Sequence, residues 1–282
     1  MDGSYLVPDD FDGILSCISP GVSTYKRFED ELLDGYGICS YLVDYSVDKH
    51  EIETPFKEGK QFFKKLRLDL KDSAKSVTLQ GLVDESDVGH GIGDKILQMD
   101  IEGGEWKVLD DAKEELLLRF RIIVIEFHGL REILLSKESL EARVLEKLRR
   151  THAVVHLHPN NYSIAYREDT TGRNLPNVME VTYLRNDRFS LTPSCPRANA
   201  HSFLDFPHPL DVQNTLDKEP LHLNKAWSMG YRSVNAQLII ERDWRKYYSK
   251  AALNGLRAIP LAARKYLKML SIKLKILGVN YQ

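Results

Sequence analysis

Acidic residues gather in one short segment, Lys95 to Trp106, which reads KILQMDIEGGEW. An apolar run leads up to Asp100, and Glu102 and Glu105 follow it beside two glycines. Carboxylates this close together repel one another unless a positive charge or a shared proton balances them. A sulfonium, a metal ion or a proton in transfer would supply that balance. The alternative is that these acids favour a helix N-terminus, which explains Glu105 well and Asp100 poorly.

A second candidate lies at the end of Arg121–Phe127 (RIIVIEF), which is almost entirely apolar and β-branched. This composition is typical of a strand buried on both faces of a sheet. The segment ends in Glu126, and His128 follows one residue later. A histidine there can act as a general base because its reference pKa is near neutrality. The alternative is a structural histidine with satisfied hydrogen bonds.

Two histidines lie two residues apart in the run Ala153–His158. If this run is a strand, His156 and His158 point to the same face of its sheet. Two histidines on one face could bind a metal ion. No cysteine is close in sequence, so we favour ordinary hydrogen bonding.

The elements that must position these residues follow from the hydrophobic pattern, which alternates between short apolar runs and helix-like stretches. The predicted strands are Gly13–Pro20, Ile38–Ser46, Ser76–Val83, Lys95–Ile101, Arg121–Phe127, Ala153–His158 and Val178–Arg185. The predicted helices are Tyr25–Leu33, the charged stretch Pro55–Lys71, Glu105–Leu118, and Ser136–Arg150 with Ser136 as N-cap. This order predicts an α/β, Rossmann-like, mostly parallel sheet of seven strands. The short last connection predicts that strands six and seven pair antiparallel.

In such sheets, ligands bind beyond the carboxyl ends of the strands. The first predicted strand ends in Ser19-Pro20-Gly21-Val22, where Gly21 would let the backbone approach a ligand closely. The second carries Asp44 near its end, where a carboxylate can accept both hydroxyls of a ribose. Asp48 competes for that role. The alternative for Ser19–Val22 is a plain strand-to-helix turn, and the alternative for Asp44 is an aspartate that caps a helix or stabilises a turn.

The composition is that of an ordinary globular protein: 282 residues, 43% hydrophobic and 28% charged. The formal net charge of -2 gives no electrostatic case for nucleic-acid binding. Cys17, Cys39 and Cys195 form no CxxC pair, which fits a reducing compartment. The first residues lack the apolar core of a signal peptide. We therefore expect a cytoplasmic protein.

The pattern changes after about residue 189. We predict one domain over residues 1–189 and a C-terminal extension over residues 190–282. Phe206–Asn214 could cover the site, and an apolar helical face near the end is flanked by basic residues. That face comprises Ala263, Tyr266, Leu267, Leu270, Leu274 and Leu277. It predicts peripheral membrane association or contact with a protein; the alternative is a terminal helix docked on the domain.

Several segments together resemble the FkbM-type methyltransferase family. KILQMDIEGGEWKVL is similar to that family's signature "LKMDIEGxEWxVL". Flanking segments resemble the family in the same order, from about Asp2 to Arg185. These are DGSYLVPDD, ISPGVSTYKRFEDEL, YLVDYSVD, IEFHGL, HLHPNNY and LPNVMEVTYLR. The resemblance implies a class I methyltransferase fold, with S-adenosylmethionine as cofactor.

The resemblance also implies a reaction and a set of site residues. It implies O-methylation of a hydroxyl on a sugar or glycosylated small molecule, so the expected partner is a small-molecule or glycan acceptor. Cofactor contacts would come from Ser19, Pro20, Gly21, Val22, Asp44, Ser46 and Asp100. Catalytic roles would fall to Asp100, Glu102, Glu126 and His128, with Asp100 or His128 as the base. A divalent metal is compatible with the family, and its candidate ligands are Asp100 and Glu126.

Other functions compete with this interpretation. A Rossmann oxidoreductase would need a glycine-rich dinucleotide loop, which SPGV does not supply. A non-catalytic binding or scaffold module would have no use for the carboxylate cluster. A methyltransferase acting on a lipid or protein is a third alternative.

Overall fold

The structure is a computed structural model that describes residues 5–131, 138–163, 165–167, 174–190, 211–215, 217–221, 223 and 236–239. The predicted basic helical face at residues 263–277 and its proposed membrane or protein contact lie outside the described residues. Among the described residues, no helix is long and apolar enough to cross a membrane.

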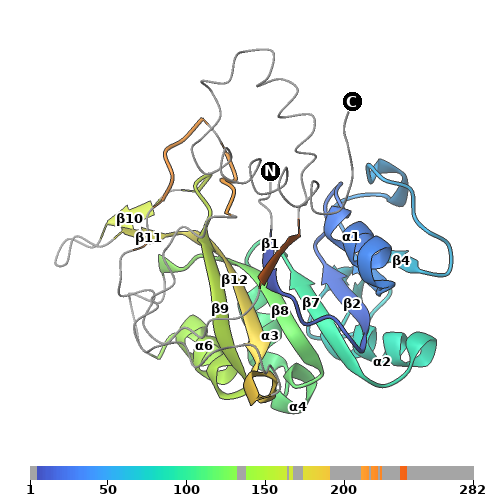
Figure 1. The fold of residues 1–282 in the computed structure, drawn as a ribbon. Helices are drawn as coiled ribbons and strands as arrows, with labels where there is room; N and C mark the ends of the chain where they lie inside the picture. Colours follow the sequence, from blue (N-terminus) through green and yellow to red (C-terminus); the bar gives the residue numbers. More distant parts are fainter. Residues whose placement is uncertain are drawn as a thin grey trace, which may run out of the picture.

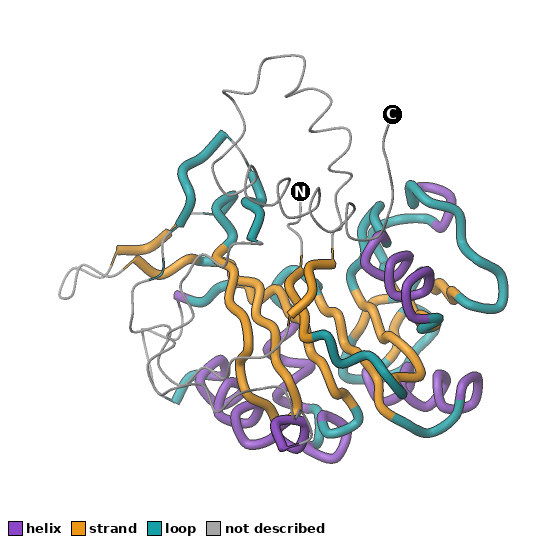
Figure 2. Tube along the Cα trace, in the orientation of Figure 1, coloured by secondary structure: helices purple, strands orange, loops and turns teal. Residues whose placement is uncertain are grey.

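A seven-stranded sheet forms the centre of the molecule (Figures 1 and 2). In spatial order its strands are β4 (Gln61–Lys64), β3 (Cys39–Val43), β2 (Ile14–Pro20), β7 (Asp94–Met99), β8 (Phe120–His128), β12 (Val178–Arg185) and β9 (His152–Pro159). The pairs from β4 to β8 are all parallel, whereas β12 runs antiparallel to both β8 and β9. This confirms the predicted class I methyltransferase-type, Rossmann-like sheet. The antiparallel strand β12 lies next to the edge strand β9.

Helices and short sheets surround the main sheet. The helices are α1 (Arg27–Tyr36), α2 (Leu79–His90), α3 (Glu105–Asp111), α4 (Glu114–Leu117) and α6 (Leu140–Thr151), with 3-10 turns η1 (Lys49–Glu51) and η2 (Asn186–Ser190). Three strand pairs lie outside it: β1 (Tyr5–Pro8) with β13 (Ala236–Ile239), β5 (Arg67–Leu68) with β6 (Ser76–Val77), and β10 (Ala165–Arg167) with β11 (Asn174–Pro176). Since β13 pairs with β1, described residues on both sides of the predicted boundary at 189 pack together. The division itself stays a prediction.

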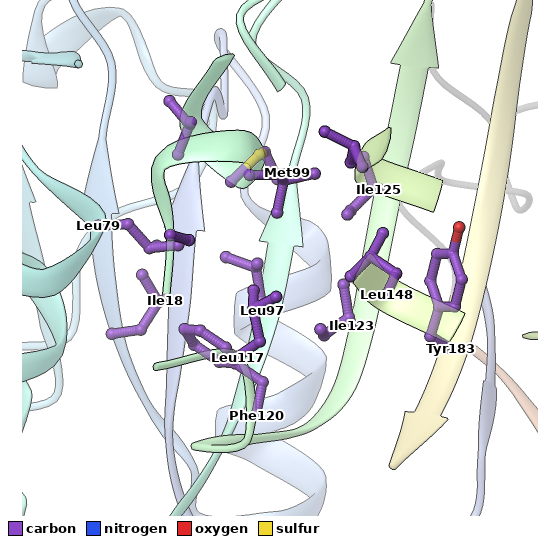
Figure 3. Packing of buried hydrophobic residues seen from close by; sticks show 14 of the residues in the cluster. Ile18, Leu79, Leu97, Met99, Leu117, Phe120, Ile123, Ile125, Leu148 and Tyr183 are labelled. Carbon is purple, nitrogen blue, oxygen red and sulfur yellow. The ribbon is translucent and has the colours of Figure 1, made fainter. Parts of the chain in front are cut away.

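Two apolar layers cover the two faces of the sheet. On one face, Ile123 and Ile125 of β8 and Leu97 of β7 pack among residues of α2, α3, α4 and α6 (Figure 3). On the other face, Val124 packs with Phe28 of α1 and with residues of β1. Successive residues of β8 therefore serve opposite layers, as strand alternation requires. Burial on both faces explains why Arg121–Phe127 is so uniformly apolar.

Two sequence predictions were wrong in the region between β3 and β7. The helical spacing assigned to Pro55–Lys71 corresponds to β4 and β5. Phe62 and Phe63 lie on opposite faces of β4, where Phe62 stacks on Tyr41 and Phe63 packs against Phe56. Two consecutive aromatic residues suit a strand whose two faces are both covered.

The predicted strand Ser76–Val83 is mostly helical. Only Ser76–Val77 is extended, and α2 begins at Leu79. The Thr78 side chain accepts a hydrogen bond from the Gly81 N–H, a standard N-cap. The predicted N-cap Ser136 lies outside the described residues; α6 is capped by Ser139, whose side chain accepts from the Ala142 N–H.

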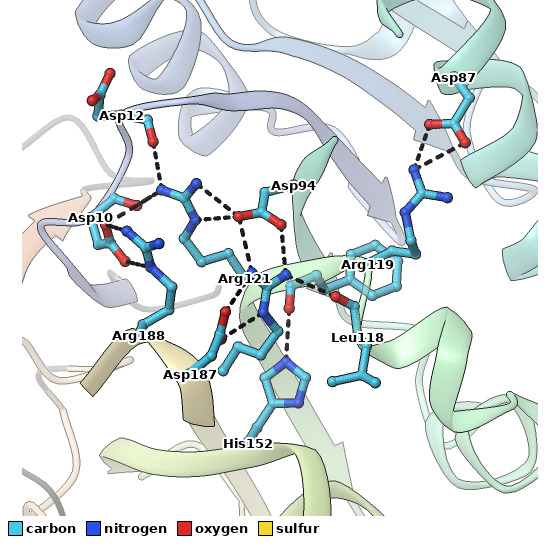
Figure 4. A network of polar contacts seen from close by, with 12 residues as sticks. Asp10, Asp12, Asp87, Asp94, Leu118, Arg119, Arg121, His152, Asp187 and Arg188 are labelled. Carbon is cyan, nitrogen blue, oxygen red and sulfur yellow. Dashed lines mark hydrogen bonds and ion pairs between the residues drawn. The ribbon is translucent and has the colours of Figure 1, made fainter. Parts of the chain in front are cut away.

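An ion-pair network closes the end of the sheet where the parallel strands begin (Figure 4). Asp94, at the start of β7, accepts hydrogen bonds from Arg121 and Arg185 at 2.6–3.1 Å. Arg188 pairs with Asp10, and Arg121 also donates to the Asp12 carbonyl oxygen. Burial lowers the pKa of nearby His152 to about 4. The charged side chains at this end therefore stabilise the sheet through ion pairs, so we look for the active site at the carboxyl ends of the strands.

Candidate active site at the carboxyl ends of the strands

The strand order reverses between β2 and β7. From β2 the chain winds outward through β3 and β4, then returns to β7 and winds the other way. Ligands in open α/β sheets bind at such a switch point, beyond the carboxyl ends of the strands. The loop Pro20–Gly21 follows β2 and Asp100 follows β7, so both lie at this point.

Gly21 brings these two loops into contact. The Asp100 N–H donates to the Pro20 carbonyl oxygen at 3.1 Å, and the Gly21 N–H donates to the Val43 carbonyl oxygen at 2.8 Å. A Cβ on Gly21 would lie 1.6 Å from the Asp100 carbonyl oxygen, and its φ is +83°. Glycine is therefore required so that the β2 loop can pack against Asp100. The close approach that we expected toward a ligand is made toward the protein's own backbone.

A tight turn carries the acidic residues after Asp100. Glu102 and Gly103 both have positive φ, 55° and 97°, and the Gly104 N–H donates back to the Ile101 carbonyl oxygen. Two left-handed residues in succession are typical of a type I′ turn. The buried Glu105 carboxylate accepts from the Ile101 and Gly103 N–H groups at 2.9 and 3.2 Å. Glu105 thus stabilises the turn.

His128 lies among four carboxylates. Its Nδ1 is 3.2 Å from Glu105 Oε1, and its Nε2 is 3.3 Å from Glu102 Oε2. The same Nε2 is 3.9 Å from Asp100 Oδ1 and 3.9 Å from Glu126 Oε1. The structure therefore brings together all four predicted catalytic residues and adds Glu105.

The charge of His128 follows from these neighbours. Burial by itself would lower the pKa of its imidazole. The hydrogen bond with Glu105 and the negative charges of Glu105, Asp100 and Glu102 outweigh burial, so the pKa of His128 is raised above its ordinary 6.5. The imidazolium form therefore extends toward neutral pH and balances part of the negative charge. A raised pKa favours the protonated imidazole, which donates a hydrogen bond and does not accept one.

Other contacts fix the end of β8. The Trp106 Nε1–H donates to the His128 carbonyl oxygen at 2.6 Å, and the Trp106 ring stacks on Phe127 with centroids 4.3 Å apart. Glu126 Oε1 accepts from the Asn160 side-chain amide at 2.9 Å. These contacts hold the His128 backbone and the Glu126 carboxylate at the switch point.

A buried polar row continues from Glu126 across the sheet. Glu126, Glu180 and His158 are register partners on β8, β12 and β9, so they lie side by side on one face. All three are less than 8% exposed. Glu180 and Asn160 were not among the site residues predicted from the sequence. A lone glutamate inside the apolar strand Val178–Arg185 was the available signal.

Asp44 holds its own loop. One carboxylate oxygen accepts from the Ser23 N–H at 2.8 Å, and the other accepts from the Ser46 N–H and hydroxyl at 2.7 and 2.6 Å. A carboxylate has about four acceptor positions, so these bonds leave roughly one for a ligand hydroxyl. The structure places Asp44 beside the β2 loop, as expected. Ser46 contacts Asp44, and its hydroxyl is engaged in that contact.

Ser19 points into the protein. It is fully buried, and its hydroxyl lies within hydrogen-bonding distance of Glu29 Oε1 and, at 2.7 Å, of Gln98 Oε1. Its side chain therefore cannot reach a ligand above the sheet. Burial raises the pKa of Glu29 to about 7. Ser19 and Glu29 support the β2 loop from below.

An open depression of about 520 Å³ lies elsewhere, lined by Lys49, His50, Ile52, Thr54, Pro55 and Phe56. None of the predicted site residues lines it. The chemistry therefore points to the switch point and not to this depression.

No family model matches the chain, and no curated protein matches it. Among solved structures, the chain is similar to the 16S rRNA (adenine(1408)-N(1))-methyltransferase from Catenulisporales acidiphilia, at 12% identity and a TM-score of 0.32. The match covers 62% of this chain and 88% of that chain. The fold assignment accordingly depends on the strand order and directions described above.

Proposed function

We propose that this chain is an S-adenosylmethionine-dependent O-methyltransferase acting on a hydroxyl of a sugar or glycosylated small molecule. The observation that carries the proposal is the convergence of Asp100, Glu102, Glu126 and His128 at the switch point of a class I-type sheet. The ordered resemblance of the sequence to FkbM-type methyltransferases supports the same reaction.

The residues present fit such a cofactor in part. Asp44 follows β3 and retains acceptor capacity for a ribose hydroxyl, and the backbone of Pro20, Gly21 and Val22 borders the same end of the sheet. The Asp100 carboxylate, with 12% of its side chain exposed, provides negative charge where a sulfonium would need it. When bound, the cofactor would supply an electrophilic methyl group.

For the chain's own residues we propose the following roles. Asp100 accepts the proton of the acceptor hydroxyl, since a base must lie within hydrogen-bonding reach of the reacting oxygen. His128 orients Asp100 and balances the nearby carboxylates. Glu126 and Asn160 would hold further acceptor hydroxyls, because carboxylate and amide groups hydrogen-bond well to polyhydroxyl compounds. A divalent ion held by Asp100, with Glu126 as the second sequence candidate, belongs to the same proposal. In the structure, Asp100, Glu102 and His128 each offer one ligand atom, and these three atoms lie within 4.8 Å of one another.

The test begins with binding and proceeds to transfer. Equilibrium dialysis with labelled S-adenosylmethionine should show one saturable site, and binding of NAD in its place would favour an oxidoreductase. Mass spectrometry of small glycosides incubated with the labelled cofactor should then reveal a methylated product. Asp100→Asn should abolish turnover even at saturating cofactor; near-normal turnover would remove Asp100 from the mechanism.

Two alternatives are separated by the same experiment. A scaffold module would bind neither cofactor. A methyltransferase for lipids or proteins would bind the cofactor but methylate no glycoside, and label would appear in those fractions. Cytoplasmic location and membrane association through the C-terminal segment, for which the sequence predicts a helix, are likewise proposals. Fractionation tests the first, and liposome pelleting of the full chain against one ending near Leu256 tests the second.

A further inference from the structure

Toward its carboxyl end, the edge strand β9 carries His156 and His158, whose side chains are only 8% exposed. His156 and His158 lie two residues apart and so point to the same face of the sheet. A third group reaches them from a segment far along the chain. His156 Nε2 is 2.9 Å from Asp211 Oδ1, and His158 Nδ1 is 3.9 Å from Asp211 Oδ2. One ligand atom from each residue lies within 4.8 Å of the others.

We propose that His156, His158 and Asp211 bind one divalent transition-metal ion, for which Zn²⁺ is the probe. Two imidazole nitrogens and a carboxylate oxygen form a donor set that zinc and its neighbours favour. Bonds of about 2.0–2.1 Å in a tetrahedron place ligand atoms about 3.3 Å apart. His156 Nε2 faces one carboxylate oxygen of Asp211 at 2.9 Å and His158 Nδ1 faces the other at 3.9 Å, so the three side chains are close enough to converge on one ion with small rotations. Three protein ligands leave a position for water or another oxygen ligand.

A hydrogen bond with Asn214 orients His158 for this role. The Asn214 side chain, 1% exposed, donates from Nδ2 to Glu180 Oε1 at 2.6 Å, which turns its Oδ1 toward His158 Nε2 at 3.1 Å. The His158 Nε2–H therefore donates to Asn214, and Nδ1 is directed toward Asp211. A hydrogen bond from the second ring nitrogen to an amide or carboxylate is the usual support of a metal-binding histidine.

The segment that delivers Asp211 is also anchored. The buried Asn161 side chain donates to the Thr215 and Lys218 carbonyl oxygens at 2.8 and 3.2 Å and accepts from the Thr215 N–H at 2.9 Å. Asn161 lies just after β9, so the same strand end positions both histidines and the third ligand. A site whose ligands are fixed before binding loses less entropy when the ion enters.

This site differs from the acidic cluster at Asp100. That cluster also offers three ligand atoms, but it includes a single imidazole and the 85% exposed Glu102. A transition metal should prefer the buried site with two imidazoles. The number of bound imidazoles therefore reports which site is occupied, and the outcome is independent of the proposed methyl transfer.

The experiment uses the untagged full chain, freed of metal by a chelator and titrated with Zn²⁺ against a chromophoric competitor. We expect one equivalent to bind, and X-ray absorption at the zinc edge to show two imidazole ligands. His158→Gln and Asp211→Asn should each weaken binding at least tenfold. The exposed His50 provides the matched control, and His50→Gln should bind as the unchanged chain does.

The absorption measurement needs no variant, so the proposal stays testable if a substitution impairs folding. No saturable binding, a single bound imidazole, or equal affinity in His158→Gln and Asp211→Asn would overturn it. In that case the three residues form only a buried ion-pair cluster.

Discussion

Replacing Glu29 with glutamine should stabilise the protein at neutral pH. Glu29 lies on α1, fully buried, and its carboxyl contacts the Ser19 hydroxyl beneath the β2 loop. The Ser19 hydroxyl has one proton but two oxygen neighbours, Glu29 Oε1 and Gln98 Oε1. A protonated Glu29 can donate to Ser19 while Ser19 donates to Gln98. Burial, the largest influence, accordingly raises the pKa of Glu29 from 4.5 to about 7.

The magnitude follows from the difference between the folded and unfolded pKa values. Below about pH 4.5, Glu29 is protonated in both states, and its stabilising contribution is fully present. Between pH 4.5 and 7 the unfolded chain releases the proton and the folded chain retains it, so the free energy of unfolding falls as pH rises. Each pKa unit corresponds to about 1.36 kcal/mol, which gives a total loss of about 3 kcal/mol. The amide in the Glu29→Gln variant does not ionise, so the variant escapes this loss.

The assay is urea unfolding of both proteins at several pH values from 4.5 to 8. The difference in unfolding free energy should grow in favour of Glu29→Gln as pH rises, reaching about 3 kcal/mol and levelling above pH 7. Glu58→Gln provides a control at an exposed position. A difference that does not change with pH would refute the reasoning, because it would mean that Glu29 is ionised in the folded state.

Three further predictions concern backbone fit, the ion-pair network and the acidic turn. Gly21→Ala should cost at least about 2 kcal/mol in thermal unfolding and weaken S-adenosylmethionine binding in dialysis, because its Cβ would collide with the Asp100 carbonyl oxygen; unchanged binding would contradict this. Burial would raise the pKa of Asp94, but hydrogen bonds from Arg185 and a second arginine hold it below 3.8. Asp94→Asn should therefore lower the free energy of unfolding in urea by about 2–3 kcal/mol at pH 7. This loss should shrink as pH falls below 3.8, because Asp94 itself then becomes protonated. A loss that stays constant over this pH range would count against the ion pairs. Glu102→Gly should raise the free energy of unfolding by about 0.5–1 kcal/mol, because glycine adopts a φ of 55° without strain. The same variant should transfer methyl groups more slowly, and full activity would show that the Glu102 carboxylate is dispensable.

The strands nearest the site were predictable because their sequences satisfy one strong requirement. Arg121–Phe127 and Val178–Arg185 are buried on both faces, so most of their residues are apolar and a buried glutamate in each stands out. Pro55–Lys71 was harder, because β4 is a short edge strand whose aromatic residues match helical spacing by coincidence. Local spacing alone cannot report which neighbours will cover a residue.

The gathering of Asp100, Glu126 and His128 was also predictable, because the carboxyl ends of neighbouring parallel strands must meet. The sequence does not show which hydrogen-bond partner each of these side chains will have. Ser19 and Asp44 follow their strands in the expected places, but Ser19 is turned inward by Glu29 and Asp44 is engaged by Ser46. Those partners depend on rotamers and loop paths that no spacing encodes.

Contacts between residues far apart in the sequence were the hardest to predict, as the histidines of β9 show. His156 and His158 look like an incomplete metal site in the sequence, because the third ligand is absent from their neighbourhood. The fold supplies Asp211 through a segment anchored by Asn161, and Asn214 then fixes the orientation of the second imidazole. Glu180, the register partner of both His158 and Glu126, lies between these groups and the acidic cluster. One buried polar layer therefore runs from the switch point to the edge of the sheet. A change of charge at either end of this layer should alter the electrostatic environment at the other end through Glu180.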